Sequence, residues 1–337
     1  MNATRYPWID FLKTLGIVLV VAGHTHLPSE QHRWIYSFHM PLFFLISGFL
    51  LAPGALAVSP REFVSKRIRK LLELYFGFGI LAMLYYCYAF RDTQSLGMSL
   101  QERIASLLYA SGSKNQSTDL YPVVLWYFPG LICALLLVYG SWQIPSKIGR
   151  FFALGIIVTL GVMMSGRALP WELESGCIAA GWIAIGHVLR LRQWDLAAVR
   201  APAAVGLLAV LMGSTLALFN SSPPDIRLAS LGHPWLSVPA ALLMIVGFFL
   251  LCKNLPSFRL ITATSAATIL IFPTHTMAFP YVDRIALKIP SMHQAVASNA
   301  PWYLWSKTVL VVALTVLLHA IYQSFQTYRK RQKASQI

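Results

Sequence analysis

The chain has 337 residues, of which 57% are hydrophobic and only 12% are charged, and its mean hydropathy is +0.61. Soluble proteins carry about 25% charged residues, so this composition excludes a soluble enzyme, a disordered chain and a collagen-like chain. The net charge of +15 comes from 27 Lys+Arg against 12 Asp+Glu. In a membrane protein such an excess is typical of basic residues that anchor cytoplasmic loops. We therefore expect membrane lipids as partners and no nucleic acid.

The apolar residues come in long runs rather than in alternation, which favours spanning helices over a β-barrel. A spanning helix needs about 20 mostly apolar residues. We predict an all-α, polytopic membrane helical bundle with about ten transmembrane helices, because runs of this kind occur near residues 9–27, 34–53, 71–90, 122–142, 151–166, 173–189, 202–219, 235–252, 260–279 and 303–323. No repeat or linker divides the chain. We expect a single membrane-embedded domain over residues 1–337, with a basic cytoplasmic tail over residues 324–337.

Lysines and arginines predict the orientation of the bundle. If the N-terminus is inside, the inner segments hold 17 of these residues and the outer segments hold 9. Lys307 is counted among the outer nine, and Lys13 lies within the first run. Because basic residues concentrate on the cytoplasmic side, this split predicts that both termini are cytoplasmic.

The first two runs hold most of the ionisable residues that fall inside apolar sequence, namely Asp10, Lys13, His24 and His39. Charged groups inside a bilayer are costly, so they are candidates for function. Lys13 and His24 are eleven residues apart, which puts them on one helix face about 16 Å apart along the axis. Asp10 can pair with Lys13. The alternative interpretation is an interfacial ion pair together with a hydrogen-bonded histidine.

The first two runs resemble the acyltransferase-3 family of integral membrane acyltransferases. The family's aspartate, arginine and histidine of the first span correspond to Asp10, Lys13 and His24, with lysine in the place of the arginine. A second family stretch corresponds to the segment His39-Met40-Pro41-Leu42-Phe43-Phe44, followed by Ser47-Gly48-Phe49. The resemblance implies catalytic roles for Asp10, Lys13, His24 and His39, and an acyl-CoA contact for Lys13.

Three further stretches extend the resemblance. Arg67 and Arg69 fall on the arginine positions of the family's basic stretch, which implies binding of the acyl-CoA phosphates; ordinary anchoring at the cytoplasmic surface is the alternative. Trp126 and Tyr127 match the family's aromatic entry to the fourth span. His275 ends a serine- and threonine-rich stretch of the ninth. The resemblance implies substrate binding by Trp126, Tyr127 and His275, although His275 is equally suited to hydrogen bonding between helices.

The resemblance implies an O-acyltransferase of the cytoplasmic (inner) membrane. Its donor is acetyl-CoA or another acyl-CoA, which is a substrate rather than a permanently bound cofactor. Its acceptor is a hydroxyl of a cell-surface or secreted polysaccharide, or of the lipid-linked precursor. No cysteine or histidine spacing predicts a metal site. A secondary transporter or lipid-linked glycan flippase, and a membrane scaffold without catalytic activity, are the alternatives.

Overall fold

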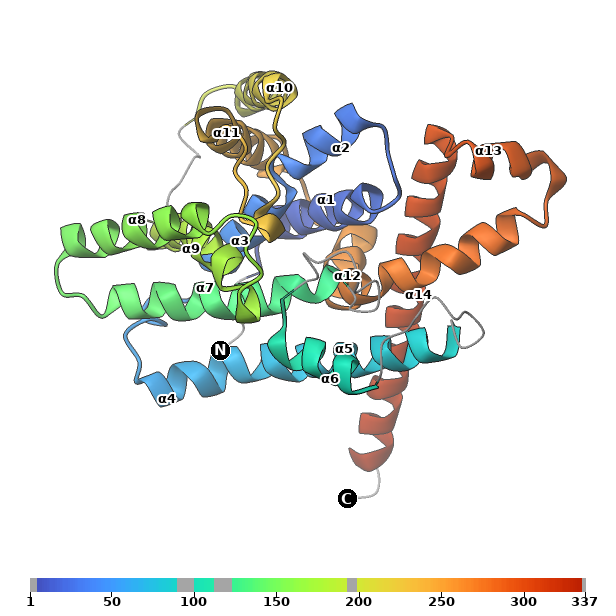
Figure 1. Ribbon diagram of the computed structural model, residues 1–337, viewed down its shortest axis with the longest axis horizontal. Helices are drawn as coiled ribbons and strands as arrows, with labels where there is room; N and C mark the ends of the chain where they lie inside the picture. The colour runs from blue at the N-terminus through green and yellow to red at the C-terminus, as the bar shows by residue number, and fades with distance from the viewer. Residues whose placement is uncertain (1–4, 90–99, 112–122, 193–198, 335–337) are drawn as a thin grey trace. The chain divides into compact units, whose positions relative to one another are not determined.

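The computed structural model is helical throughout the ranges that it describes, which are residues 5–89, 100–111, 123–192 and 199–334 (Figure 1). The only β pairing within these ranges is an isolated bridge between Asp225 and Ser230. The predicted all-α membrane bundle is confirmed. Six helices in the described residues are long and apolar enough to cross a membrane, so the number of about ten spans stays a prediction.

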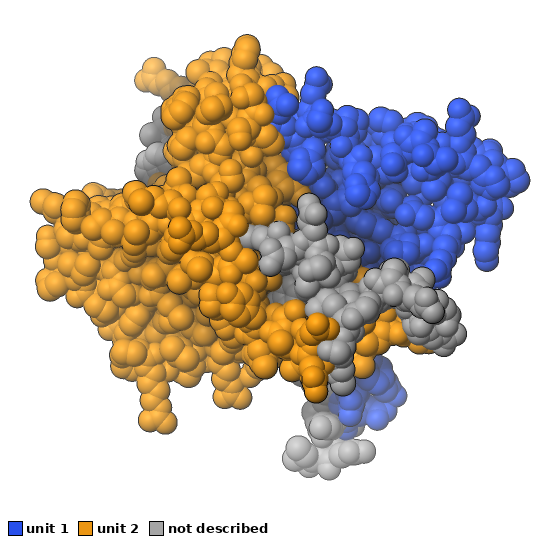
Figure 2. Space-filling model, viewed as in Figure 1, with its two compact units in different colours: residues 1–35, 248–337 blue, residues 36–247 orange. Residues whose placement is uncertain are grey.

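The chain divides into two compact units (Figure 2). Unit 1 comprises residues 1–35 and 248–337, and unit 2 comprises residues 36–247. Both units contain helices that are long and apolar enough to cross a membrane. The prediction of a single membrane domain therefore stays a prediction.

Unit 1 is built around three long helices. They are α1 (Pro7–Gly23), α12 (Arg259–Ala286) and α14 (Pro301–Ala334), and each packs against the other two (Figure 1). Pro7 begins α1 at a position where its missing N–H costs no helical hydrogen bond. The unit also holds α2 (Ser29–Tyr36) apart from its last residue, the end of α11 (Pro234–Cys252), and the short α13 (His293–Ala297).

Helix α12 contains two prolines, Pro273 and Pro280. Proline has no N–H, so the carbonyl groups four residues earlier, those of Ile269 and Thr276, lose their helical partners. Membrane helices tolerate such breaks where neighbouring helices and side chains support the freed groups. The section between the prolines includes His275.

Unit 2 is organised around α9 (Leu173–Leu191), which packs against α3 (His39–Phe49), α7 (Tyr127–Trp142) and α8 (Lys147–Met163) (Figure 1). Small residues on α9 permit these contacts. The remaining helical elements of the unit are α4 (Pro60–Phe63), the π-helical turn η1 (Val64–Ile68), α5 (Arg69–Ala89), α6 (Leu100–Tyr109), η2 (Val123–Trp126), η3 (Pro170–Glu172), α10 (Pro202–Phe219), η5 (Ile226–Leu228) and most of α11.

The predicted span over residues 34–53 is wrong as a single helix. The chain breaks after α2, and α3 begins at His39 and ends at Phe49. At 1.5 Å per residue, the 11 residues of α3 cover about 16 Å, roughly half of the hydrocarbon core. Pro41 explains where α3 begins, because proline fits the first turn of a helix and not its interior.

Two glycines set the distance between α3 and α9. A Cβ added to Gly186 would lie 2.0 Å from the carbonyl oxygen of Leu45, and one added to Gly48 would lie 2.0 Å from that of Ile183. A Cβ atom does not approach a non-bonded oxygen this closely, so each position requires glycine. Gly48 and Gly186 thus permit the close packing of α3 against α9.

We expect Gly186→Ala to destabilise the protein, because the added methyl group forces α3 and α9 apart. Overpacking typically costs about 1–3 kcal/mol. The matched control is Gly155→Ala in α8, where nothing lies within 4 Å of an added Cβ and the change gains about 1 kcal/mol of helix propensity. Thermal unfolding of the purified variants in one detergent measures both. Equal unfolding temperatures for Gly186→Ala and the wild type would contradict the close approach.

Candidate functional site

Helices α1 and α12 lie side by side in unit 1 and run in the same direction. Thr14 Oγ1 donates a hydrogen bond to the carbonyl oxygen of Ile261 at 3.0 Å, and the ring of His24 lies 5.0 Å from that of His275. Contacts near the N-terminal end of α1 thus involve early residues of α12, and contacts at its C-terminal end involve later ones. Lys13 also contacts α12, so Lys13 and His24 share one face of α1, as their spacing predicts.

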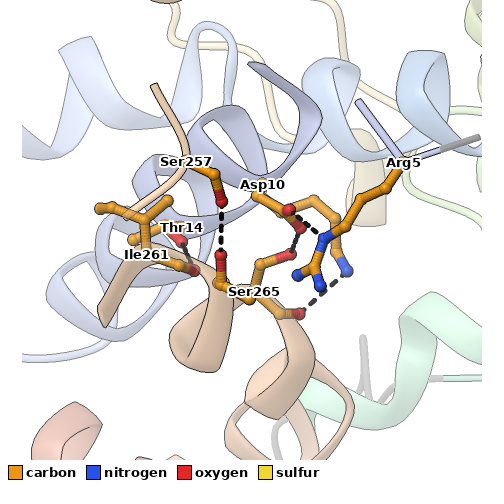
Figure 3. A network of polar contacts seen from close by, with 8 residues as sticks. Arg5, Asp10, Thr14, Ser257, Ile261 and Ser265 are labelled. Carbon is orange, nitrogen blue, oxygen red and sulfur yellow. Dashed lines mark hydrogen bonds and ion pairs between the residues drawn. The ribbon is translucent and has the colours of Figure 1, made fainter. Parts of the chain in front are cut away.

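A polar cluster surrounds the carboxylate of Asp10 (Figure 3). Arg5 Nε donates to one oxygen at 2.7 Å, and Ser265 Oγ donates to the other at 2.6 Å. Asp10 is buried, whereas the Arg5 side chain is 58% exposed. The hydrogen bond to Asp10 raises the pKa of the Arg5 guanidinium above its usual value. Both oxygens of Asp10 are therefore held by donors from two different segments.

The predicted ion pair between Asp10 and Lys13 is wrong. Arg5 takes that place, and Lys13 Nζ donates instead to the carbonyl oxygen of Ser265 at 2.9 Å. The helical i,i+3 rule missed Arg5 because this residue precedes the helix, where Tyr6 is extended with φ −106° and ψ 108°. The family pattern has an arginine where this chain has Lys13. In this chain Arg5 supplies the guanidinium that binds Asp10.

The two imidazoles at the other end of this face have defined tautomers. Nδ1 of His24 lies 2.8 Å from the carbonyl oxygen of Val20, and Nδ1 of His275 lies 3.1 and 2.8 Å from those of Ile271 and Phe272. A carbonyl oxygen only accepts, so Nδ1 of each ring carries a proton and Nε2 of the neutral ring carries the lone pair. Nε2 of His275 is buried and has no hydrogen-bond partner among the described residues.

His39 belongs to unit 2, whereas His24 belongs to unit 1. His39 is buried at the start of α3, where its ring lies 4.9 Å from that of Tyr36. Within unit 1, the ring of His24 lies 5.0 Å from that of His275. The catalytic role of His39 stays a prediction.

Trp126 and Tyr127 pack in the core of unit 2. The ring of Phe44 lies 6.2 Å from that of Trp126 and 5.1 Å from that of Tyr127. The hydroxyl group of Tyr127 lies 3.3 Å from that of Ser47, so the two share a hydrogen bond. These contacts join the start of α7 to α3, and the substrate-binding roles of both residues stay predictions.

Arg67 and Arg69 differ in their surroundings. Arg67 lies in the π-helical turn Val64–Ile68, is half-buried, and forms no hydrogen bond or ion pair with any residue that the structure describes. Arg69 pairs with Glu73 at 2.8 Å, and its side chain is 76% exposed. Single π-helical turns inserted in α-helices are frequent at functional sites. The donors of Arg67 thus remain available for an anion.

Lys307 was counted among the outer basic residues, and the side of the membrane on which it lies stays a prediction. Its side chain is only 6% exposed within α14, and Nζ donates to the two carboxylate oxygens of Asp283 at 3.0 and 3.3 Å. The hydroxyl group of Tyr303 donates to the same carboxylate. The spacing of four residues between Tyr303 and Lys307, which puts both on one helix face, was the signal that could have found this cluster.

The described residues contain no group of three or more His, Cys, Asp and Glu side chains that could hold a metal ion. The chemistry that the α1–α12 face offers is that of an acid–base pair of imidazoles at one end. At the other end, it offers a hydrogen-bonded carboxylate with two cationic side chains.

We expect Ser265→Ala to lower the stability of the protein, because Asp10 loses a buried donor. Hydrogen bonds to charged groups contribute about 1.5–3 kcal/mol. Ser257→Ala is the control, since the hydroxyl group of Ser257 is exposed and bonds only that of Thr262 among the described residues. Thermal unfolding is the measurement. The packing of α1 on α12 would not depend on this bond if both variants unfolded at the same temperature.

Comparison with known proteins gives one finding. A family model described as an acyltransferase domain matches residues 6–320, which is nearly the whole chain. No curated protein and no solved structure matches. The match includes α1 and α12 with their two histidines, and the polar cluster apart from Arg5. This multi-pass membrane protein with buried ionisable groups on α1 and α12 therefore belongs to the acyltransferase-3 family, and it is a membrane acyltransferase.

Proposed function

We propose that the protein transfers an acetyl group from cytosolic acetyl-CoA to a hydroxyl group of a cell-surface or secreted polysaccharide, or of its lipid-linked precursor. The observation that carries this proposal is the contact between His24 and His275, with Nδ1 of each ring hydrogen-bonded to the backbone. An imidazole in this tautomer presents a basic Nε2, which is the group that activation of an alcohol requires. Family membership favours acyl transfer over a transporter or a scaffold.

In the proposed reaction, Nε2 of His24 accepts the proton of the acceptor hydroxyl group while its oxygen attacks the thioester carbonyl carbon. The C–S bond then breaks, the proton passes from the imidazolium to the leaving thiolate, and an ester and free CoA result. His24 is half-buried and is the better base of the two, because His275 is completely buried. His275 lies where it can orient the ring of His24.

The orientation is part of the proposal: both termini, Arg5 and Arg67 are cytoplasmic. The support is the division of 17 lysines and arginines against 9 between alternating segments. The donor then reaches the polar end of α1 from the cytosol, and the histidines act near the outer face.

Arg67 is the better candidate for binding the donor phosphates. Arg67 is half-buried and its guanidinium has no partner among the described residues, whereas that of Arg69 is already paired with Glu73. Arginine binds phosphate with two parallel hydrogen bonds. Lys13 contributes a second positive charge at the cytoplasmic end of α1, where we place the donor arm. The roles of Trp126 and Tyr127 in holding the substrate belong to the same proposal.

We expect His24→Ala to lower kcat for acetyl transfer by about 10²–10⁴-fold, the typical contribution of a general base, and to leave the affinity for acetyl-CoA unchanged. The matched control is His319→Ala in α14, whose imidazole contacts Gln323 on the same helix. Transfer to a saccharide acceptor and donor binding are measured on purified variants with equal unfolding temperatures. Normal turnover by His24→Ala would refute the mechanism.

We expect Arg67→Ala to weaken acetyl-CoA binding by about 10–100-fold, because a hydrogen bond to a charged group contributes about 1.5–3 kcal/mol. Arg69→Ala is the comparison, and its effect is smaller because its ion pair with Glu73 is exposed. Raising the salt concentration weakens wild-type binding as well. The measurement is calorimetry with acetyl-CoA. If both variants bind like the wild type, these arginines only anchor the membrane topology.

A further inference from the structure

The section of α12 that carries His275 is weakly held by its own helix. Pro273 and Pro280 remove two helical hydrogen bonds, one on each side of it. His275 nevertheless needs a fixed position, since its ring meets that of His24 at 5.0 Å. The support for this section must come from other helices.

That support is visible on α14. Asp283 lies three residues beyond Pro280 and receives hydrogen bonds from Tyr303 and Lys307. Lys307 is 6% exposed and Asp283 is 33% exposed. Burying a charge such as that of Lys307 costs several kcal/mol before its attraction to a partner is counted, and apolar replacements of buried ion pairs are often neutral or stabilising. A need for stability alone therefore does not explain why a lysine is buried here.

The ring of Phe279 lies between the ammonium group of Lys307 and the imidazole of His275 and contacts both. Lys307 Nζ lies 5.2 Å from the ring centre of Phe279, within the range of a cation–π contact. The ring of Phe279 lies 5.8 Å from that of His275 at an angle of 68°. A continuous series of contacts thus runs from Lys307 through Phe279 and His275 to His24.

We propose that Asp283, Lys307 and Tyr303 are positioning residues for the acyl-transfer site. The carboxylate fixes Lys307, the ammonium group fixes the ring of Phe279, and this ring holds the imidazole of His275 against His24. The proline-bounded section of α12 is thereby held to α14 at the one place where its backbone is least supported. The inference rests on the proposed function for its kinetic consequence and on the structure alone for the placement of His275.

The test compares two variants. Lys307→Met removes the charge and keeps most of the length of the side chain, whereas Lys307→Arg keeps the charge. Lys288→Met is the matched control, because Lys288 is exposed beyond the end of α12. Acetyl transfer and acetyl-CoA binding are measured on each purified protein. Independently, the rate at which diethyl pyrocarbonate modifies His275 is measured by mass spectrometry, which requires no turnover.

We expect Lys307→Met to lower kcat by about 10-fold or more, with unchanged KM for the donor, and to speed the modification of His275. Lys307→Arg restores both properties, and Lys288→Met matches the wild type. Combining Lys307→Met with His275→Ala lowers kcat no further than His275→Ala alone, because both changes act through one side chain. If Lys307→Met does not fold, Phe279→Leu removes the same ring without unpairing a charge, and the same results are expected.

Unchanged kcat and unchanged protection of His275 in the folded variants would overturn the inference. Equal losses in Lys307→Met and Lys307→Arg, or additive losses with His275→Ala, would also overturn it, because they indicate a general packing role. A wild-type protein that transfers no acetyl group refutes the proposed function instead. In that case the modification rate of His275 still decides whether Asp283, Lys307 and Tyr303 position this residue.

Discussion

The cost of placing charge inside an apolar bundle governs this structure. Two buried charged groups of unit 1 are matched by partners on another segment: Asp10 by Arg5 and Ser265, and Lys307 by Asp283. Because an unpaired ion in such surroundings is expensive, these contacts determine which helices meet. Helices α1 and α12 contact each other at the polar residues of α1. Helix α14 packs against α12 at the polar residue Asp283.

Much of the fold followed from the sequence, since long apolar runs leave few alternatives to spanning helices. The shared face of Lys13 and His24 followed as well, because helical geometry fixes it. The partner of Asp10 did not follow: an ion pair three residues away on the same helix was the local solution, and Arg5 was available only because the chain is extended before Pro7. Local spacing rules do not cover contacts that cross a helix end.

The contact between His24 and His275 did not follow from the sequence either. The structure places His275 beside His24 from a helix more than two hundred residues away. The burial of Lys307 did not follow from the sequence either, since a lysine near the end of an apolar run is normally a surface anchor. Only packing against Asp283 shows that it is buried.

The contact between α1 and α12 also has a consequence for biogenesis. The two helices meet through residues 255 positions apart, Asp10 and Ser265, so α1 leaves the ribosome long before its partner exists. Until α12 is made, Arg5 is the side chain of unit 1 at hand to neutralise Asp10, and Lys13 lacks its acceptor. Helix α1 is thus inserted with its polar contacts incomplete, and the lipid bilayer must accommodate it in this state until α12 is made.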